Sequence, residues 1–176
     1  MKRIILAKFK KNQVALKSSQ AVFVFVHYGR RVPSYLKKNI SNVCQQFPDY
    51  KVILLTDRFI HLNHKNFSSL NVLEVNDFDK AQNGLKHPLN FRKGFWATTF
   101  LRLVAVSKFA TQTKQPVIHI ESDVVVSQDF PISKLIGLKN TLAYPIVAPG
   151  LAVASILYFS DSETASSFNT FLDKHL

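Results

Sequence analysis

The chain has 176 residues, of which 47% are hydrophobic and 12% aromatic; this composition predicts one globular domain and excludes an intrinsically disordered protein. Its single cysteine, Cys44, excludes an internal disulfide and a zinc site built from several cysteines, and fits a reducing, cytoplasmic compartment. The formal net charge of +12 predicts an anionic partner of one of three classes: a phosphate-bearing small molecule, a nucleic acid or an anionic membrane surface.

Residues 1–20 form a basic N-terminal segment, and residues 21–176 are predicted to form the domain. Two interpretations of the segment stay open: a basic amphipathic stretch for a membrane surface, or a frayed terminus without consequence. Its apolar run is too short for a signal-peptide core. The run Ala21–Val26 is far shorter than the roughly 18 residues that cross a bilayer. We therefore expect a soluble, cytoplasmic protein, at most peripheral at the inner face of the membrane.

Three apolar stretches predict buried strands in the first half of the domain. Ala21–Val26 and Lys51–Thr56 are almost continuously apolar, which is typical of central strands that are covered on both faces. Asn71–Val75 predicts a third, shorter strand. The first strand runs into His27–Gly29 and the second into Asp57. Ligands of open α/β sheets bind at the carboxyl ends of the strands, so these residues are candidate walls of a site.

Two helices are predicted among the strands: one between the first and second strands, and one between the third strand and the next. The first begins at Ser34 as its cap and ends near Phe47. The second spans Gly94–Ala110, with Thr98 and Arg102 away from its apolar face. That face is predicted to be Phe95, Trp96, Phe100, Leu103, Val104 and Ser107, with Trp96 in the core. The sequence has neither the glycine-rich dinucleotide motif nor a P-loop, which argues against dehydrogenases and P-loop NTPases.

The segment Pro116–Val126 predicts a buried strand that leads into two carboxylates, Glu121 and Asp123. Because side chains alternate along a strand, we expect the two carboxylates to project on the same side. Between Asp79 and Glu121 the sequence has seven basic residues and no acidic one. This setting favours a site for a divalent cation and phosphate. The alternative is that the pair simply begins a solvated loop.

The remaining elements follow in short succession. Ile132–Leu138 predicts a short helix, and two further apolar stretches, Thr141–Tyr144 and Leu151–Phe159, follow it. A last helix is predicted to start after Ser160 or Asp161 as its cap.

In this order the elements resemble the nucleotide-sugar half of a glycosyltransferase of the GT-A fold. The matching motifs are H-Y-G at 27–29, T-D-R at 56–58, F-W-A-T-T-F-L-R-L at 95–103 and I-E-S-D-V at 120–124. The last one resembles the D-x-D motif of that family in an E-x-D form. The resemblance spans roughly Val22 to Phe159 and implies an α/β, GT-A-like (Rossmann-like) fold with a mostly parallel central sheet flanked by helices.

The resemblance also implies an activity: transfer of a sugar from a nucleoside diphosphate donor, of the UDP or GDP type, to a glycan or a lipid-linked acceptor. It implies that Asp123, assisted by Glu121, holds Mn²⁺ or Mg²⁺ on the donor's diphosphate. It places Arg102 and Arg92 near the phosphates.

For the nucleoside, the resemblance implies that His27, Tyr28 and Gly29 border the base, with Tyr28 available to stack. Asp57 would then lie near the base or the ribose.

Members of the family usually add a C-terminal part that binds the acceptor, whereas only 17 residues follow Phe159 here. The resemblance is therefore expected to be to a truncated or divergent version of the family. Two other functions stay open. One is a degenerate, non-catalytic module that binds a nucleotide. The other is a basic domain that binds nucleic acid or a membrane; against nucleic acid, the sequence shows no recognisable motif with aromatic residues beside basic ones.

Overall fold

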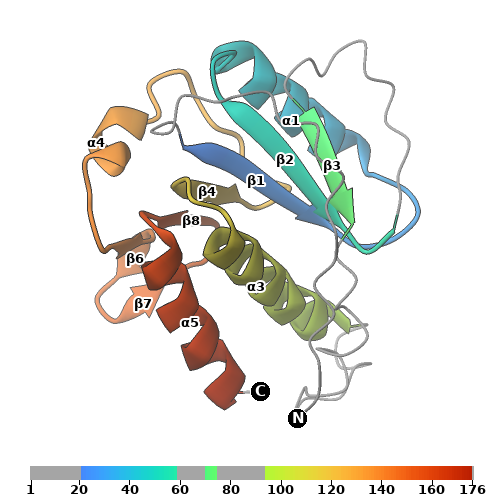
Figure 1. The fold of residues 1–176 in the computed structure, drawn as a ribbon. Coiled ribbons are helices and arrows are strands. Elements are labelled where there is room, and N and C mark those ends of the chain that lie inside the picture. The colour runs from blue at the N-terminus through green and yellow to red at the C-terminus, as the bar shows by residue number, and fades with distance from the viewer. Residues whose placement is uncertain (1–20, 59–69, 75–93, 176) are drawn as a thin grey trace.

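The structure is a computed structural model that describes residues 21–58, 70–74 and 94–175. Figure 1 shows a central sheet with helices on both of its faces. In chain order the elements are β1 (Val22–His27), α1 (Ser34–Gln46), β2 (Lys51–Thr56), β3 (Leu70–Glu74), α3 (Phe95–Gln112), β4 (Val117–Ile120), α4 (Ile132–Ile136), β5 (Leu142–Ala143), β6 (Ile146–Ala148), β7 (Leu151–Ala152), β8 (Ile156–Phe159) and α5 (Ser162–His175).

The main sheet has six strands in the order β3-β2-β1-β4-β8-β5. The first four are parallel, β8 is antiparallel to β4, and β5 is antiparallel to β8. The prediction of an α/β fold with a central sheet flanked by helices is therefore confirmed, and the sheet is a mixed one with four parallel strands. Because β1, β2 and β4 run in one direction, their carboxyl ends meet at the same edge, where ligands of such sheets bind.

The strands β1 and β2 form as predicted because both of their faces are buried. On β1, Phe23 and Phe25 pack toward α1, whereas Val22, Val24 and Val26 pack toward α3 and α5. The two faces of the sheet thus have separate cores, one under α1 and α4 and the other under α3 and α5 (Figure 1). A strand that contributes to two cores has no polar face, which explains its continuous apolar run.

The buried face of α3 differs from the predicted one. Its buried residues are Ala97, Leu101, Val104, Ala105, Val106, Ser107 and Ala110. Trp96 is 48% exposed and Phe95 59% exposed, so the prediction that Trp96 lies in the core is wrong. The two rings contact each other edge to face, with centroids 5.6 Å apart. Small side chains let α3 lie close to the sheet, and the large aromatics stay at the first turn on the outside.

Two elements also differ from expectation, and the predicted cap of the last helix is confirmed. α1 begins at Ser34 itself, preceded by Pro33, and no side chain caps it. The last helix is capped by Asp161, whose Oδ1 accepts a hydrogen bond of 2.8 Å from Thr164 N–H. The apolar stretch Leu151–Phe159 is divided between β7, in a two-stranded sheet with β6, and β8 in the main sheet. Within the part of the chain that the structure describes, no helix is long and apolar enough to cross a membrane.

Candidate ligand site at the carboxyl ends of the parallel strands

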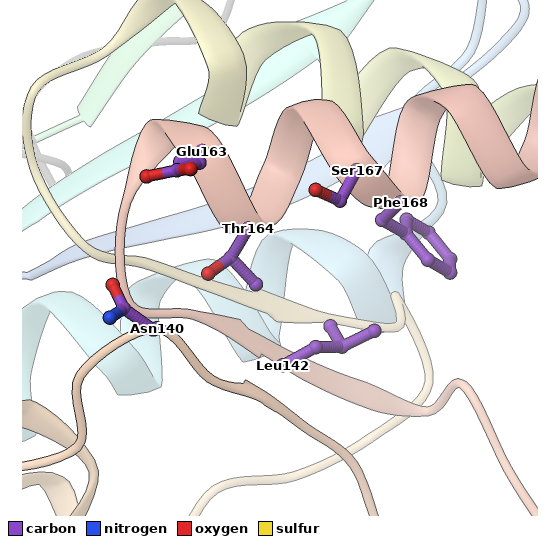
Figure 2. A pocket seen from close by; sticks show the side chains of 6 residues that line it. All are labelled: Asn140, Leu142, Glu163, Thr164, Ser167 and Phe168. Atoms are coloured by element: carbon purple, nitrogen blue, oxygen red, sulfur yellow. The ribbon is translucent and has the colours of Figure 1, made fainter.

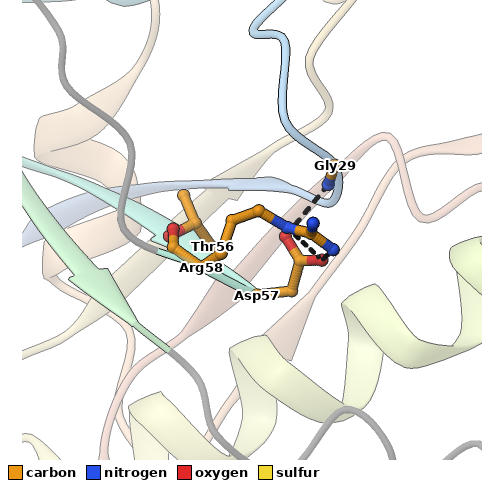
Figure 3. A network of polar contacts seen from close by, with 4 residues as sticks. All are labelled: Gly29, Thr56, Asp57 and Arg58. Atoms are coloured by element: carbon orange, nitrogen blue, oxygen red, sulfur yellow. Dashed lines mark hydrogen bonds and ion pairs between the residues drawn. The ribbon is translucent and has the colours of Figure 1, made fainter.

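The end of β2 is tied to the end of β1 by Asp57 (Figure 3). Asp57 Oδ1 accepts a hydrogen bond of 2.9 Å from Gly29 N–H. Its Oδ2 accepts bonds from Arg58, of 2.6 Å from Nη2 and 3.0 Å from Nε. Burial on its own would raise the pKa of Asp57, but the hydrogen bonds from Arg58 and Gly29 outweigh it and lower that pKa. Both oxygens of Asp57 are therefore engaged in holding the protein together.

Gly29 has a backbone φ of +112°, in the region that favours glycine. A Cβ added there would meet no atom within 4 Å, so the requirement for glycine lies in the backbone and not in the space around it. This conformation lets the chain turn so that Gly29 N–H points at Asp57.

His27 and Tyr28 lie beside this turn and are half-buried. Tyr28 donates a hydrogen bond of 2.9 Å from its hydroxyl to Leu101 O on α3, and its ring packs against the core under α3. Burial raises the pKa of the Tyr28 hydroxyl, so it stays protonated. Burial lowers the pKa of His27 and favours its neutral form. Stacking of Tyr28 on a nucleobase stays a prediction. The hydrogen bond to Leu101 O on α3 would hold the Tyr28 ring in place for it.

Arg102 and Glu121 form an ion pair between α3 and the residue that follows β4. The Arg102 side chain is 16% exposed and that of Glu121 25% exposed, so the pair is largely withdrawn from water. Arg102 Nε is buried and has no hydrogen-bond partner in the described ranges. Arg102 is therefore no ordinary surface cation: it is held in place by one carboxylate and keeps an unused donor.

His119, on β4, is completely buried next to this pair. Its Nδ1 lies 3.0 Å from Val24 O, which can only accept, so Nδ1 carries the proton. Burial, and then the positive charge of Arg102, lower its pKa to about 3. The neutral ring supports the end of β4 without adding a charge beside Arg102.

The two carboxylates of the E-x-D motif lie on different sides of the sheet. β4 ends at Ile120, and Val124 N–H donates to Glu121 O at 3.1 Å in a turn. Glu121 contacts α3, whereas Asp123 lines a hollow against α1. The expectation that both project on the same side assumed a strand through Asp123 and is wrong. The turn, and not strand alternation, sets their directions.

Asp123 is exposed, and no hydrogen bond or ion pair engages it in the described part of the chain. The hollow beside it has a volume of about 510 Å³ and is lined by Tyr35, Lys38, Asn39, Ser41, Asn42, Gln45, Asp123 and Val125. Two amides of α1 anchor the loop that carries Asp123: Asn39 Nδ2 donates to Ser122 O at 2.7 Å, and Asn42 Nδ2 donates to Val126 O at 2.9 Å. Asp123 is thus a free carboxylate on a loop that is anchored to a helix.

We tested these residues against the Mn²⁺ or Mg²⁺ that the resemblance implies. Among the described residues there is no group of three His, Cys, Asp or Glu side chains that could enclose a metal ion. Glu121 is engaged by Arg102, which leaves Asp123 as the available carboxylate. One carboxylate suffices for Mg²⁺ when substrate phosphates and water supply the other ligands. The donor set therefore fits an ion shared with a diphosphate and does not fit a cage made of protein alone.

A second hollow, of about 480 Å³, lies at the other end of the sheet, between the start of α5 and β5 (Figure 2). It is lined by Asn140, Leu142, Glu163, Thr164, Ser167 and Phe168. None of the predicted site residues is among them. We therefore place the candidate site at the carboxyl ends of β1, β2 and β4.

The structure brings together His27, Tyr28, Gly29 and Asp57 at the ends of β1 and β2, and Arg102 with Glu121 at the end of β4. Arg92 lies outside the described residues. Sequence reasoning missed Asn39, Asn42 and His119 as supports of the site. Asn39 and Asn42 are three residues apart, a spacing that places them on one face of α1. The sequence does not show what that face contacts.

Comparisons with known proteins bear on the fold. No protein-family model matches the chain, and no curated protein matches it. Among solved structures, the chain is similar to that of a transferase carrying two cysteine-to-serine mutations. The match has a TM-score of 0.53 and 9% sequence identity, and it covers 90% of this chain and 79% of the other. At this identity the likeness establishes an α/β fold like that of the transferase and nothing about substrate.

Proposed function

We propose that the protein is a metal-dependent glycosyltransferase of the GT-A type, which transfers a sugar from a nucleoside diphosphate donor to a glycan or lipid-linked acceptor. The observation that carries the proposal is that the end of β4 has two separate groups: a largely buried arginine, Arg102, held by Glu121, and an uncommitted carboxylate, Asp123, on a loop anchored to α1. These are the two kinds of group that a metal-bound diphosphate needs. The transferase-like fold of the solved neighbour supports the same class.

In this proposal Arg102 recognises the diphosphate. A guanidinium can form two parallel hydrogen bonds with phosphate oxygens, and Arg102 Nε is an unused donor. Glu121 holds the side chain in place before the donor binds, so little side-chain entropy is lost on binding. A partly buried arginine also interacts more strongly with an anion than an exposed one, because less water screens it.

Asp123 is proposed to hold the divalent ion together with the donor's phosphates. When bound, such an ion neutralises charge on the departing diphosphate. The hollow between Asp123 and α1 lies directly beyond this carboxylate, and its hydroxyl, amide and tyrosine side chains suit the hydroxyl groups of a sugar. We assign the hollow to the transferred sugar.

The decisive experiment is calorimetric titration with UDP and with GDP, each with and without Mn²⁺. We expect one of them to bind more tightly with the metal, and Asp123→Ala to abolish that gain. Asp49→Ala is the matched control, since it removes an exposed carboxylate just after α1, outside the site. Absence of binding to either nucleotide under both conditions would refute the proposal.

A second function, a module that binds the nucleotide without turnover, is favoured by one observation: Glu121 is committed to Arg102, and Asp57 to Gly29 and Arg58. Among the described residues of the site, Asp123 is then the one uncommitted carboxylate, and it is assigned to the metal. Release of nucleoside diphosphate from the matching nucleotide sugar separates the two functions. Tight binding with no release over days would identify the module.

A further inference from the structure

The short hairpin β6–β7 leaves the main sheet and exposes apolar side chains. It forms a two-stranded sheet of its own, separate from the six-stranded sheet (Figure 1). Every residue from 146 to 152 is exposed. The exposed fraction is 70% for Ile146, 58% for Val147 and 55% for Leu151, and 47% for Tyr144 at the base of the hairpin. Neighbouring exposed apolar residues of this kind mark a surface that contacts a partner or a lipid phase.

The hairpin belongs to the longest stretch of the chain without charge. Residues 140–159 contain no Lys, Arg, Asp or Glu, and the first charged residue before them is Lys139. From residue 130 to residue 160 the two charged side chains are Lys134 and Lys139, both exposed. The acid that follows, Asp161, is engaged by Thr164 N–H, Asn140 N–H and Ser160. The charged residues that precede the hairpin most closely in sequence are therefore cations.

A hairpin of this size gains little stability from its own hydrogen bonds, since an isolated pair of strands is marginal in water. Its exposed valine, isoleucine and leucine thus add surface that water disfavours and give no packing in return. A membrane interface resolves this imbalance, because it takes up the apolar side chains, accepts a tyrosine at head-group depth and attracts lysines when its lipids are anionic.

We propose that the β6–β7 hairpin inserts its tip into the interface of an anionic membrane. The commitment to lipid, and not to another protein, rests on the complementary charge: the chain carries a net +12, and the two charged residues that precede the hairpin most closely in sequence are the exposed Lys134 and Lys139. Ile146, Val147 and Leu151 supply the apolar contact, and Tyr144 lies at the boundary with water. The inference does not depend on the proposed sugar transfer.

The test is co-sedimentation of the full chain with two kinds of vesicle, pure phosphatidylcholine and phosphatidylcholine with roughly one third phosphatidylglycerol. The wild type is expected to bind the anionic vesicles. Ile146→Ser/Leu151→Ser is expected to weaken this binding at least about tenfold, because the variant loses two aliphatic side chains that the membrane would bury. Val125→Ser is the control: Val125 is 72% exposed but lies in the loop after β4. Serine changes no charge, so the loss reports apolar contact alone.

A second pair of variants separates charge from insertion. Lys134→Gln/Lys139→Gln is expected to weaken binding to anionic vesicles several-fold and to leave binding to neutral ones unchanged. Circular dichroism on each variant confirms that exposed substitutions leave the fold intact.

Three results would overturn the proposal. The wild type does not bind either vesicle; the serine pair binds as the wild type does, so that the basic charge elsewhere accounts for all of the binding; or the serine pair converts a dimer in solution to a monomer without changing vesicle binding. The last result would assign the hairpin to a second copy of the chain.

Discussion

The carboxyl ends of β2 and β4 both pair an acid with an arginine, but they use the pair differently. At β2, Asp57 is 7% exposed and bonded through both oxygens, while its partner Arg58 is 46% exposed. At β4 the arginine is the less exposed member, its Nε has no hydrogen-bond partner among the described residues, and Asp123, two residues after Glu121, is uncommitted. The first end ties β2 to β1 through Asp57, and the second is the end that we propose binds an anion. The two acid–arginine pairs therefore differ in how many of their hydrogen-bonding atoms are already engaged within the protein.

The largest effect on binding is expected from Arg102→Gln. Loss of charge-assisted hydrogen bonds to the diphosphate should weaken nucleotide binding by about tenfold to a hundredfold. Removing the arginine also leaves Glu121 without its partner, which should lower the free energy of unfolding by about 1–3 kcal/mol. Calorimetry and urea denaturation measure the two effects, with Lys114→Gln, an exposed lysine after α3, as the control. Unchanged binding would remove Arg102 from the site.

Asp57→Ala tests the other end of the comparison. The variant leaves Gly29 N–H without its acceptor, so the free energy of unfolding should fall by about 1–3 kcal/mol. Asp57→Asn keeps an acceptor for Gly29 and should cost less. Because a lowered pKa stabilises the fold only while the carboxylate is charged, the difference between wild type and Asp57→Asn should vanish as the pH falls through that pKa. Nucleotide affinity that falls as far as in Arg102→Gln would show that Asp57 binds ligand directly.

His119 predicts a dependence of stability on pH. In the folded protein its pKa is about 3, whereas the unfolded chain takes up the proton below about 6.5. The unfolded state therefore binds more protons between these values, and the free energy of unfolding should fall as the pH drops from 7 to 5. In His119→Gln this fall should be smaller. Denaturant unfolding at the two pH values measures it, and an equal fall in both proteins would contradict the buried neutral histidine.

The smallest effect is expected from Tyr28→Phe. The variant loses the hydrogen bond to Leu101 O and should lower the free energy of unfolding by about 0.5–1.5 kcal/mol. The ring remains, so a base stacked on it should bind as before. A large loss of nucleotide affinity with unchanged stability would instead show that the hydroxyl contacts the ligand.

Much of the fold could be predicted because buried parallel strands leave a strong pattern. β2 was predicted with its observed ends, and β1 within one residue, since each contributes to both cores. The pattern failed where apolar residues are not buried: Trp96 lies outside on α3, and the apolar stretch Leu151–Phe159 contains a turn and an exposed strand.

The sequence was enough to name residues of the candidate site, but not to predict which of them contact each other. Glu121 and Asp123 were identified from their position after an apolar strand, yet their directions depend on a turn that sequence alternation does not encode. The partners Arg102 and Glu121 come from elements that meet only in the folded sheet. Such pairings depend on how α3 packs over β4, which is decided by small residues on α3 and not by the charged pair itself.

The most direct measurement is nucleotide affinity of Glu121→Gln with and without Mn²⁺. If Glu121 only holds Arg102 in place, glutamine still offers the guanidinium an acceptor but removes the negative charge that competes with the diphosphate. Affinity without metal should then rise by several-fold while the gain from Mn²⁺ is kept. If Glu121 is itself a metal ligand, the variant should lose the gain from Mn²⁺ as Asp123→Ala does. That second result would contradict the division between a held arginine and a single free carboxylate.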